Sequence, residues 1–231
     1  MRGARGKRIE RAWATLQAAA DLAAARGSLL FHLDLATEVA RGALAAHGIA
    51  DTRVAATADA FGYQVFTLGD GASAPVLAAA RFDAAGRARI DLHPGPPPPR
   101  AAAFADARAT IAAATAARAV VVVPASDPDR PIEGYALAIA DVPDQAMLGG
   151  HWLLRLTPSG KQIMSRTPLS AGTGGVAVAA LREAALTTPD AVPHELHVYL
   201  SLKHDVPFVV AAAASGLRWR VDGERLTPLR G

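Results

Sequence analysis

The stretch Pro193–Leu229, PHELHVYLSLKHDVPFVVAAAASGLRWRVDGERLTPL, carries the clearest structural pattern of the chain. Residues 195–203 alternate strictly between apolar and polar side chains, which is typical of a half-buried antiparallel strand. Turn signals follow at His204–Asp205, Ser215–Gly216 and Asp222–Gly223, and Asp-Gly between short runs is a strong hairpin signal. We therefore expect this stretch to form a meander of four short strands.

The N-terminal region is expected to form a helical pair followed by a small antiparallel sheet. Apolar residues with helical spacing predict the first helix: Ile9, Trp13, Leu16 and Ala20. We expect Gly27–Ser28 to end that helix and Asp34 to cap a second one. Short strand-like runs then continue to about residue 93.

The segment His93–Arg100, HPGPPPPR, is the clearest domain boundary, because a proline run favours an extended and semi-rigid conformation. We expect an N-terminal α+β module at residues 1–93, a proline-rich linker at 94–100, and a C-terminal α+β module at 101–231. The C-terminal module is expected to contain an antiparallel meander sheet with flanking helices, so the predicted fold class is α+β.

Composition excludes several functional classes. The chain has 231 residues, a formal net charge of +3 and no cysteine, so disulfides, thiol catalysis and thiolate metal sites are excluded. The basic residues do not form the clustered face of a nucleic-acid-binding protein. No apolar run reaches the length of a membrane span. We expect a cytoplasmic protein without a cofactor, or an exported one if an export segment has been removed.

Three histidines lie close together in the C-terminal stretch: His194, His197 and His204. Histidine is a common metal ligand, which makes a metal site one hypothesis. On a strand, however, residues three apart point to opposite faces, so His194 and His197 are expected to be separated. We therefore expect no metal site and keep the three histidines as the alternative.

A hydrolase is the enzymatic alternative. Asp91 and His93 lie near each other, and Ser28 precedes a helix-like turn, so a Ser/His/Asp site between the two modules can be imagined. No nucleophile-elbow motif accompanies these residues. The sequence therefore favours a protein without catalytic residues.

The leading hypothesis is a non-catalytic binding or protein-interaction protein of a bacterial cell, with a protein partner or self-association. The motivation is that no nucleophile, acid–base pair or ligand cluster stands out. Trp219 shares its expected face with Leu217 and Val221, so the polar face of the meander is expected to point outward. The partner-binding residues are then His197, Tyr199, Lys203, Arg218 and Arg220.

Two patterns of the second half resemble those of a group of uncharacterised bacterial proteins: GGHWLLRLTPSGKQIMSRTPLS at Gly149–Ser170 and HELHVYLSLKHDVPFVVAAAASGLRWRVDGERL at His194–Leu226. The resemblance covers about residues 101–229. Such proteins are associated with export or the cell envelope, and often carry a cysteine where this chain has Gly172–Gly175. The resemblance implies an autonomous α+β module and no particular reaction.

Overall fold

The structure is a computed structural model that describes residues 2–49, 53–59, 62–69, 76–82, 88–92, 94–96, 98–115, 117, 119–125, 127–142, 144–170, 172, 174–183 and 185–229. Within helix and strand, the side chains of residues 2–11 and of Asp59 lie outside this description. The chain forms two compact units, each discontinuous in sequence. Unit 1 contains Met1–Phe31, Ala140–Gly150 and Leu169–Gly231, and unit 2 contains His32–Ile139 and His151–Pro168.

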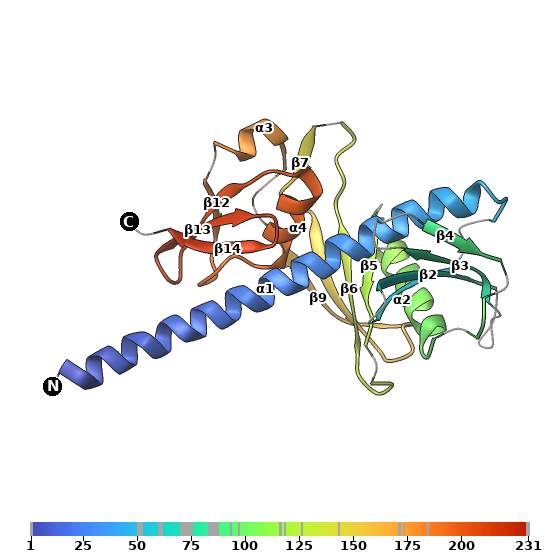
Figure 1. Cartoon of the computed structure of the whole chain (residues 1–231), viewed down its shortest axis with the longest axis horizontal. Coiled ribbons are helices and arrows are strands. Elements are labelled where there is room, and N and C mark those ends of the chain that lie inside the picture. Colours follow the sequence, from blue (N-terminus) through green and yellow to red (C-terminus); the bar gives the residue numbers. More distant parts are fainter. Residues whose placement is uncertain are drawn as a thin grey trace. The chain divides into compact units, whose positions relative to one another are not determined.

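The N-terminal region is one helix, α1 (Arg2–Ala45), and the expected helical pair is wrong. Figure 1 shows α1 in blue as a single rod. Gly27 does not end the helix. Its lack of a side chain allows α1 to pack closely against residues 195–198. A Cβ added to Gly27 would lie 2.5 Å from Val198 Cβ and 2.6 Å from the Glu195 carbonyl oxygen. Among the described helices, α1 included, none combines the length and apolarity that a membrane crossing needs.

The first sheet belongs to unit 2 and is antiparallel throughout, in the order β1-β2-β3-β4. Its strands are β1 (Val54–Asp59), β2 (Gly62–Leu68), β3 (Val76–Phe82) and β4 (Ala88–Asp91). One face of the sheet packs against the end of α1 through Ala36, Ala40 and Leu44. The other face packs against α2 (Ala101–Thr115). Because both faces are covered, β3 is buried at three successive alanines, and it shows no apolar–polar alternation.

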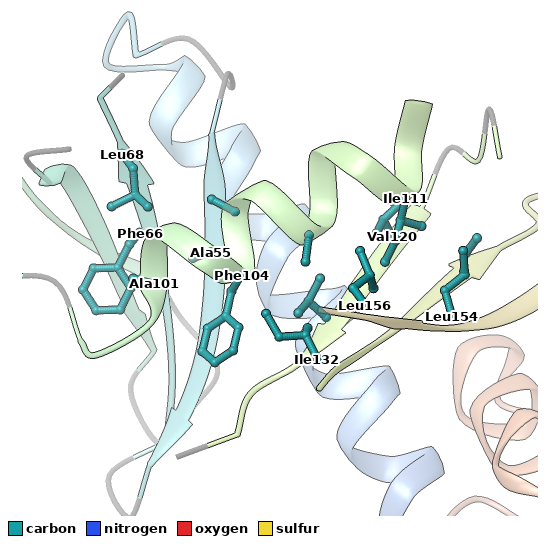
Figure 2. Packing of buried hydrophobic residues seen from close by; sticks show 14 of the residues in the cluster. Ala55, Phe66, Leu68, Ala101, Phe104, Ile111, Val120, Ile132, Leu154 and Leu156 are labelled. Carbon is teal, nitrogen blue, oxygen red and sulfur yellow. The ribbon is translucent and has the colours of Figure 1, made fainter. Parts of the chain in front are cut away.

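A second antiparallel sheet of unit 2, in the order β5-β6-β8-β9, shares its core with the first. Its strands are β5 (Ala119–Val123), β6 (Ile132–Leu137), β8 (His151–Leu156) and β9 (Ile163–Leu169). Figure 2 shows Phe66 and Leu68 of β2, Phe104 and Ile111 of α2 and Leu156 of β8 in one buried cluster. The structure thus differs from the expected modules 1–93 and 101–231. Side chains on both sides of the 94–100 segment belong to one core, so this segment is a connection within unit 2.

Unit 1 contains a short two-stranded sheet, a one-turn helix and a four-stranded sheet. The small sheet pairs β7 (Gln145–Met147) with β10 (Gly175–Ala177), and α3 (Val178–Leu181) follows directly. The larger sheet has the order β11-β12-β13-β14, and Figure 1 labels its last three strands. Its strands are β11 (Ala185–Thr188), β12 (Phe208–Ala212), β13 (Leu217–Asp222) and β14 (Arg225–Leu229). The last three form the expected antiparallel meander, whereas β11 pairs with β12 in parallel.

The expected first strand of the meander is instead a helix, α4 (Glu195–His204), and the strand assignment of 195–203 is wrong. Leu196 through Ser201 are six consecutive buried residues, so α4 is buried on all sides at its centre. A helix that is enclosed in this way has no amphipathic stripe, and its sequence shows no period of 3.6. The helix also provides the crossover that a parallel β11–β12 pair requires. The mixed α+β fold class is confirmed.

Candidate functional site

The first turn of α4 is built around two histidine side chains. His194 is the N-cap residue, with extended backbone angles (φ −98°, ψ 174°), and its Nδ1 accepts a hydrogen bond from the backbone N–H of Leu196 at 3.3 Å. His197 reaches back, and its Nδ1 accepts from the backbone N–H of His194 at 3.2 Å. This is a capping box, in which two N–H groups at the helix start are satisfied reciprocally by side chains three residues apart.

The helix therefore brings His194 and His197 together, and the prediction that they point to opposite faces is wrong. Their ring centroids lie 4.0 Å apart with an interplanar angle of 54°. Because each Nδ1 accepts a backbone N–H, each neutral ring carries its proton on Nε2. The His194 Nε2 lies 3.3 Å from the carbonyl oxygen of Ser170 and donates to it. The Nε2 of His197 is buried and has no hydrogen-bond partner among the described residues.

The environment of this pair disfavours the charged imidazolium. Burial lowers the pKa of His197 well below its usual value, and the neighbouring His194 lowers it further. Burial also lowers the pKa of His194, against opposing contributions from Glu195, the Ser170 carbonyl and Asp190. His197 has no exposed surface. Both rings are therefore held in the neutral form at neutral pH.

The three histidines do not make a metal site in the described part of the chain. His204 is the last residue of α4, at the opposite end of the helix from His194. Both Nδ1 atoms of the close pair are occupied by backbone N–H groups, and the His194 Nε2 donates to Ser170. Across the described residues, no group of three or more potential ligand side chains is gathered for a metal ion.

The expected outward face of the meander exists only in part. Arg218 and Arg220 are exposed on β13, as expected, but His197 and Tyr199 are buried inside unit 1. Lys203 is half-buried on α4, which packs against the opposite face of the sheet through contacts such as His197 with Phe208. The prediction of a single face that joins these five residues is therefore wrong, because three of them belong to a helix.

The outer face of the C-terminal sheet, defined by the residues of β11–β14 that point away from α4, carries three arginines and one aspartate. The strand register places Arg220 beside Val209 and Arg218 beside Ala211. Arg225 lies directly opposite Asp222 in the β13–β14 pair. Asp222 accepts from Arg220, with Nη2 to Oδ2 at 3.1 Å. Trp219 and Val221 point the other way and are buried.

The residues of the hydrolase alternative are only partly described. Ser28, on α1, donates its hydroxyl to Glu224 in the β13–β14 turn at an oxygen–oxygen distance of 2.5 Å. Asp91 is the last residue of β4 and belongs to unit 2, whereas Ser28 belongs to unit 1. His93 lies outside the described residues. The Ser/His/Asp hypothesis therefore stays a prediction.

Sequence reasoning missed the capping box and the pairing of Ser28 with Glu224. A signal for the capping box was present, because His194-x-x-His197 places two side chains with acceptor atoms at the N-cap and N3 positions, ahead of a run of apolar residues. The pair of Ser28 and Glu224 joins residues 196 positions apart. No local sequence pattern predicts a contact between residues so far apart. Comparison of the chain with protein-family models, curated proteins and solved structures found no match.

Proposed function

We propose that the protein is a non-catalytic binding protein and that its partner docks on the outer face of the C-terminal sheet. The observation that carries this proposal is that Arg218, Arg220 and Arg225 lie on one exposed sheet face. Asp222 is the single carboxylate on that face, so positive charge is in excess there. A sheet face fixes the spacing of its side chains, because alternate residues on neighbouring strands project in the same direction. The arginines are therefore held as an array.

The chemistry of this face favours an acidic protein segment as partner. A guanidinium group binds a carboxylate with two parallel hydrogen bonds, which adds geometric specificity to charge attraction. The small side chains of Ala211 and Val209, which are half-buried beside Arg218 and Arg220, leave space for an approaching chain. Acidic side chains on a partner can thus reach the arginines without a steric barrier from their neighbours.

Two other occupants are disfavoured by the same face. Single-stranded nucleic acid is bound by stacking of bases on aromatic side chains, and the aromatic residue of β13, Trp219, points into the core. Self-association through a two-fold axis would place the arginines of one copy against those of the other. Like charges in contact are unfavourable, so a second copy is a poorer occupant than an acidic segment.

A binding measurement with a defined probe tests the proposal. Fluorescently labelled poly-L-glutamate is titrated with the wild-type chain and with the R218E/R220E variant, and binding is followed by fluorescence anisotropy. We expect the variant to bind at least about tenfold more weakly, since both docking charges are reversed. A matched control, R166E/R182E, makes the same change of net charge at two exposed arginines that lie outside the outer face.

The outcomes separate a local site from general electrostatics. Equal weakening by both double variants would mean that poly-L-glutamate senses only the net charge, and the proposal would fail. Tighter binding of a labelled single-stranded DNA than of poly-L-glutamate would replace the acidic segment by nucleic acid. Sedimentation velocity of the wild-type chain without a probe tests for self-association. A wild-type dimer that is lost in the R218E/R220E variant would identify a second copy as the occupant.

A further inference from the structure

The capping box at the start of α4 links protonation of the His194 and His197 rings to the contact between α4 and α1. We propose that the His194–His197 pair is an acid-sensitive latch, in which protonation of either ring releases the first turn of α4 and the segment of α1 that packs against it. All the groups concerned belong to unit 1. The proposal stands on the hydrogen bonds of the two rings, on their separation and on the position of Gly27.

Protonation removes the acceptors on which the capping box depends. The Nδ1 atoms accept from the N–H groups of His194 and Leu196, and an imidazolium has a hydrogen on both nitrogens and no acceptor. A proton at either Nδ1 therefore breaks one cap and leaves a backbone N–H facing another N–H. At the start of a helix such groups are satisfied by side chains or by water, so the first turn must open to recover them.

The surroundings offer the positive charge little compensation. The start of a helix carries a partial positive charge, and the two rings lie 4.0 Å apart, so two imidazolium groups repel each other. Glu195 and Asp190 are the carboxylates that act on His194, and Glu195 also lies 3.9 Å from the guanidinium of Arg26. His197 is acted on by no carboxylate in the described residues, and its aromatic neighbour is Phe208.

The first turn of α4 also packs against α1 around Gly27. Gly27 lies against the carbonyl oxygen of Glu195 and the side chain of Val198, at distances that leave no room for a methyl group. Arg26, the preceding residue, forms an ion pair with Glu195. Because these contacts fall within residues 195–198, opening of the first turn removes the surface against which α1 is held around Gly27.

The direction of the pH dependence follows from the lowered pKa values of both histidines. In the open first turn each ring recovers a pKa of about 6.5, so the open form binds more protons than the closed form below that pH. The closed first turn is therefore most stable above about pH 6.5, and its stability relative to the open form falls as the pH falls below that value. Each histidine changes the opening equilibrium by at most about tenfold per pH unit in this window.

Amide hydrogen exchange measured by mass spectrometry tests the latch in the full chain. Exchange of peptides that cover residues 20–31 and 194–204 is compared at pH 7.5 and pH 5.0, after correction for the intrinsic exchange rate. For the wild-type chain we expect at least a tenfold loss of protection in both segments at pH 5.0. The double variant H194N/H197Q keeps side-chain acceptors at the N-cap and N3 positions and does not titrate, so its protection should be independent of pH.

A matched control uses the third histidine of the stretch. His204 is half-buried at the other end of α4, where a positive charge is favourable to the helix, and H204Q should retain the wild-type loss of protection. The same loss in H194N/H197Q as in the wild type would overturn the proposal. An NMR titration of the wild-type imidazoles serves if the double variant does not fold. Titration of His194 and His197 at the usual histidine pKa of about 6.5 would also overturn it.

Discussion

Gly27 of α1 lies in direct contact with Val198 of α4, and the helix crossing exists because residue 27 has no side chain. A Cβ at this position would come within 2.5 Å of Val198 Cβ, far inside van der Waals contact. Glycine in a helix interior lowers helix stability by about 1 kcal/mol relative to alanine. In α1 this local loss is offset by the close approach of two helices, which buries the neighbouring side chains of both.

The first prediction concerns two glycines of the same helix. Gly27→Ala should lower the free energy of unfolding by about 1–3 kcal/mol, because the added methyl group forces α1 away from α4. Gly42→Ala should raise it by about 0.5–1 kcal/mol, since a Cβ at Gly42 meets no atom of the described part of the chain within 4 Å and alanine favours the helix. Urea unfolding followed by far-ultraviolet circular dichroism measures both. Two changes of the same sign would contradict the assigned role of Gly27.

This glycine also shows why α1 could be predicted only in part from sequence. Helical periodicity over Ile9, Trp13, Leu16 and Ala20 predicts a helix there, and the structure contains one. A glycine followed by serine is a common helix end, and nothing local distinguishes such an end from a crossing point. The distinguishing partner, Val198, is far away in the sequence, so the single helix could not be deduced from the neighbourhood of Gly27.

The C-terminal stretch shows the same division between local and distant information. The hairpin at Asp222–Gly223 was predictable, because a tight turn requires a positive φ that glycine allows, and Asp-Gly is therefore a local turn signal. In the structure Gly223 adopts a φ of +56° between the paired strands. The helix α4 was not, because its alternation of leucines with polar residues matches a strand. Burial of Tyr199 and Ser201 inside unit 1 decides against that strand, and burial is a property of the assembled fold. For the candidate site, exposure of Arg218 and Arg220 followed from the strand period, whereas the contact of His194 with His197 did not.

The second prediction compares two ion pairs of unit 2. Arg53 Nη2 lies 2.6 Å from Asp106 Oδ1, and these side chains are only 16% and 26% exposed. Asp106→Asn should lower the free energy of unfolding by about 1–2 kcal/mol, because it removes the carboxylate from a largely buried guanidinium. The pair of Arg155 with Glu133 is the control, since the Arg155 side chain is 59% exposed.

The control substitution Glu133→Gln should change the free energy of unfolding by less than about 0.5 kcal/mol, because water screens an exposed pair. Thermal unfolding at low and high salt measures both variants. The difference between the Asp106→Asn variant and the wild type should persist at high salt, since buried pairs are screened less. Equal effects of the two substitutions would show that the Arg53–Asp106 pair contributes no more than a surface pair.

The third prediction separates steric crowding from backbone strain at two glycines of unit 2. Gly160 (φ +75°) and Gly48 (φ +72°) share the left-handed conformation, so alanine at either position incurs about 1–2 kcal/mol of strain. At Gly160 the added Cβ also collides with the carbonyl oxygen of Ala103 and lies 2.7 Å from the Ala107 nitrogen in α2. At Gly48 no atom of the described residues lies within 4 Å of the added Cβ.

Gly160→Ala should therefore destabilise the protein by at least about 2 kcal/mol more than Gly48→Ala, because the turn must move away from α2. Denaturant unfolding of the two variants gives the difference directly. A similar loss of stability in both would mean that the 158–160 turn shifts freely, and that its contact with α2 contributes little to the core of unit 2.

The last prediction concerns Arg100, the residue that ends the proline-rich segment. Its backbone has a positive φ of +67°, which is unfavourable for arginine, and its carbonyl oxygen accepts the N–H of Phe104 at 2.9 Å at the start of α2. The guanidinium donates to the carbonyl oxygens of Arg130 at 2.9 Å and Pro158 at 3.2 Å, and also to those of Ala125 and Asp127. One planar group thus ties two loops to the first turn of a helix.

Arg100→Lys keeps the charge but loses this arrangement, because an ammonium group carries its donors on a single atom and cannot reach the carbonyl oxygens of two loops at once. We expect a loss of about 2 kcal/mol in the free energy of unfolding, close to that of Arg100→Ala, since the hydrogen bonds rather than the charge are the stabilising element. Arg130→Lys, at an exposed arginine whose backbone carbonyl alone is used by Arg100, is the control and should change little. A lysine variant as stable as the wild type would show that charge near the carbonyl oxygens is sufficient and that the planar geometry of Arg100 is not required.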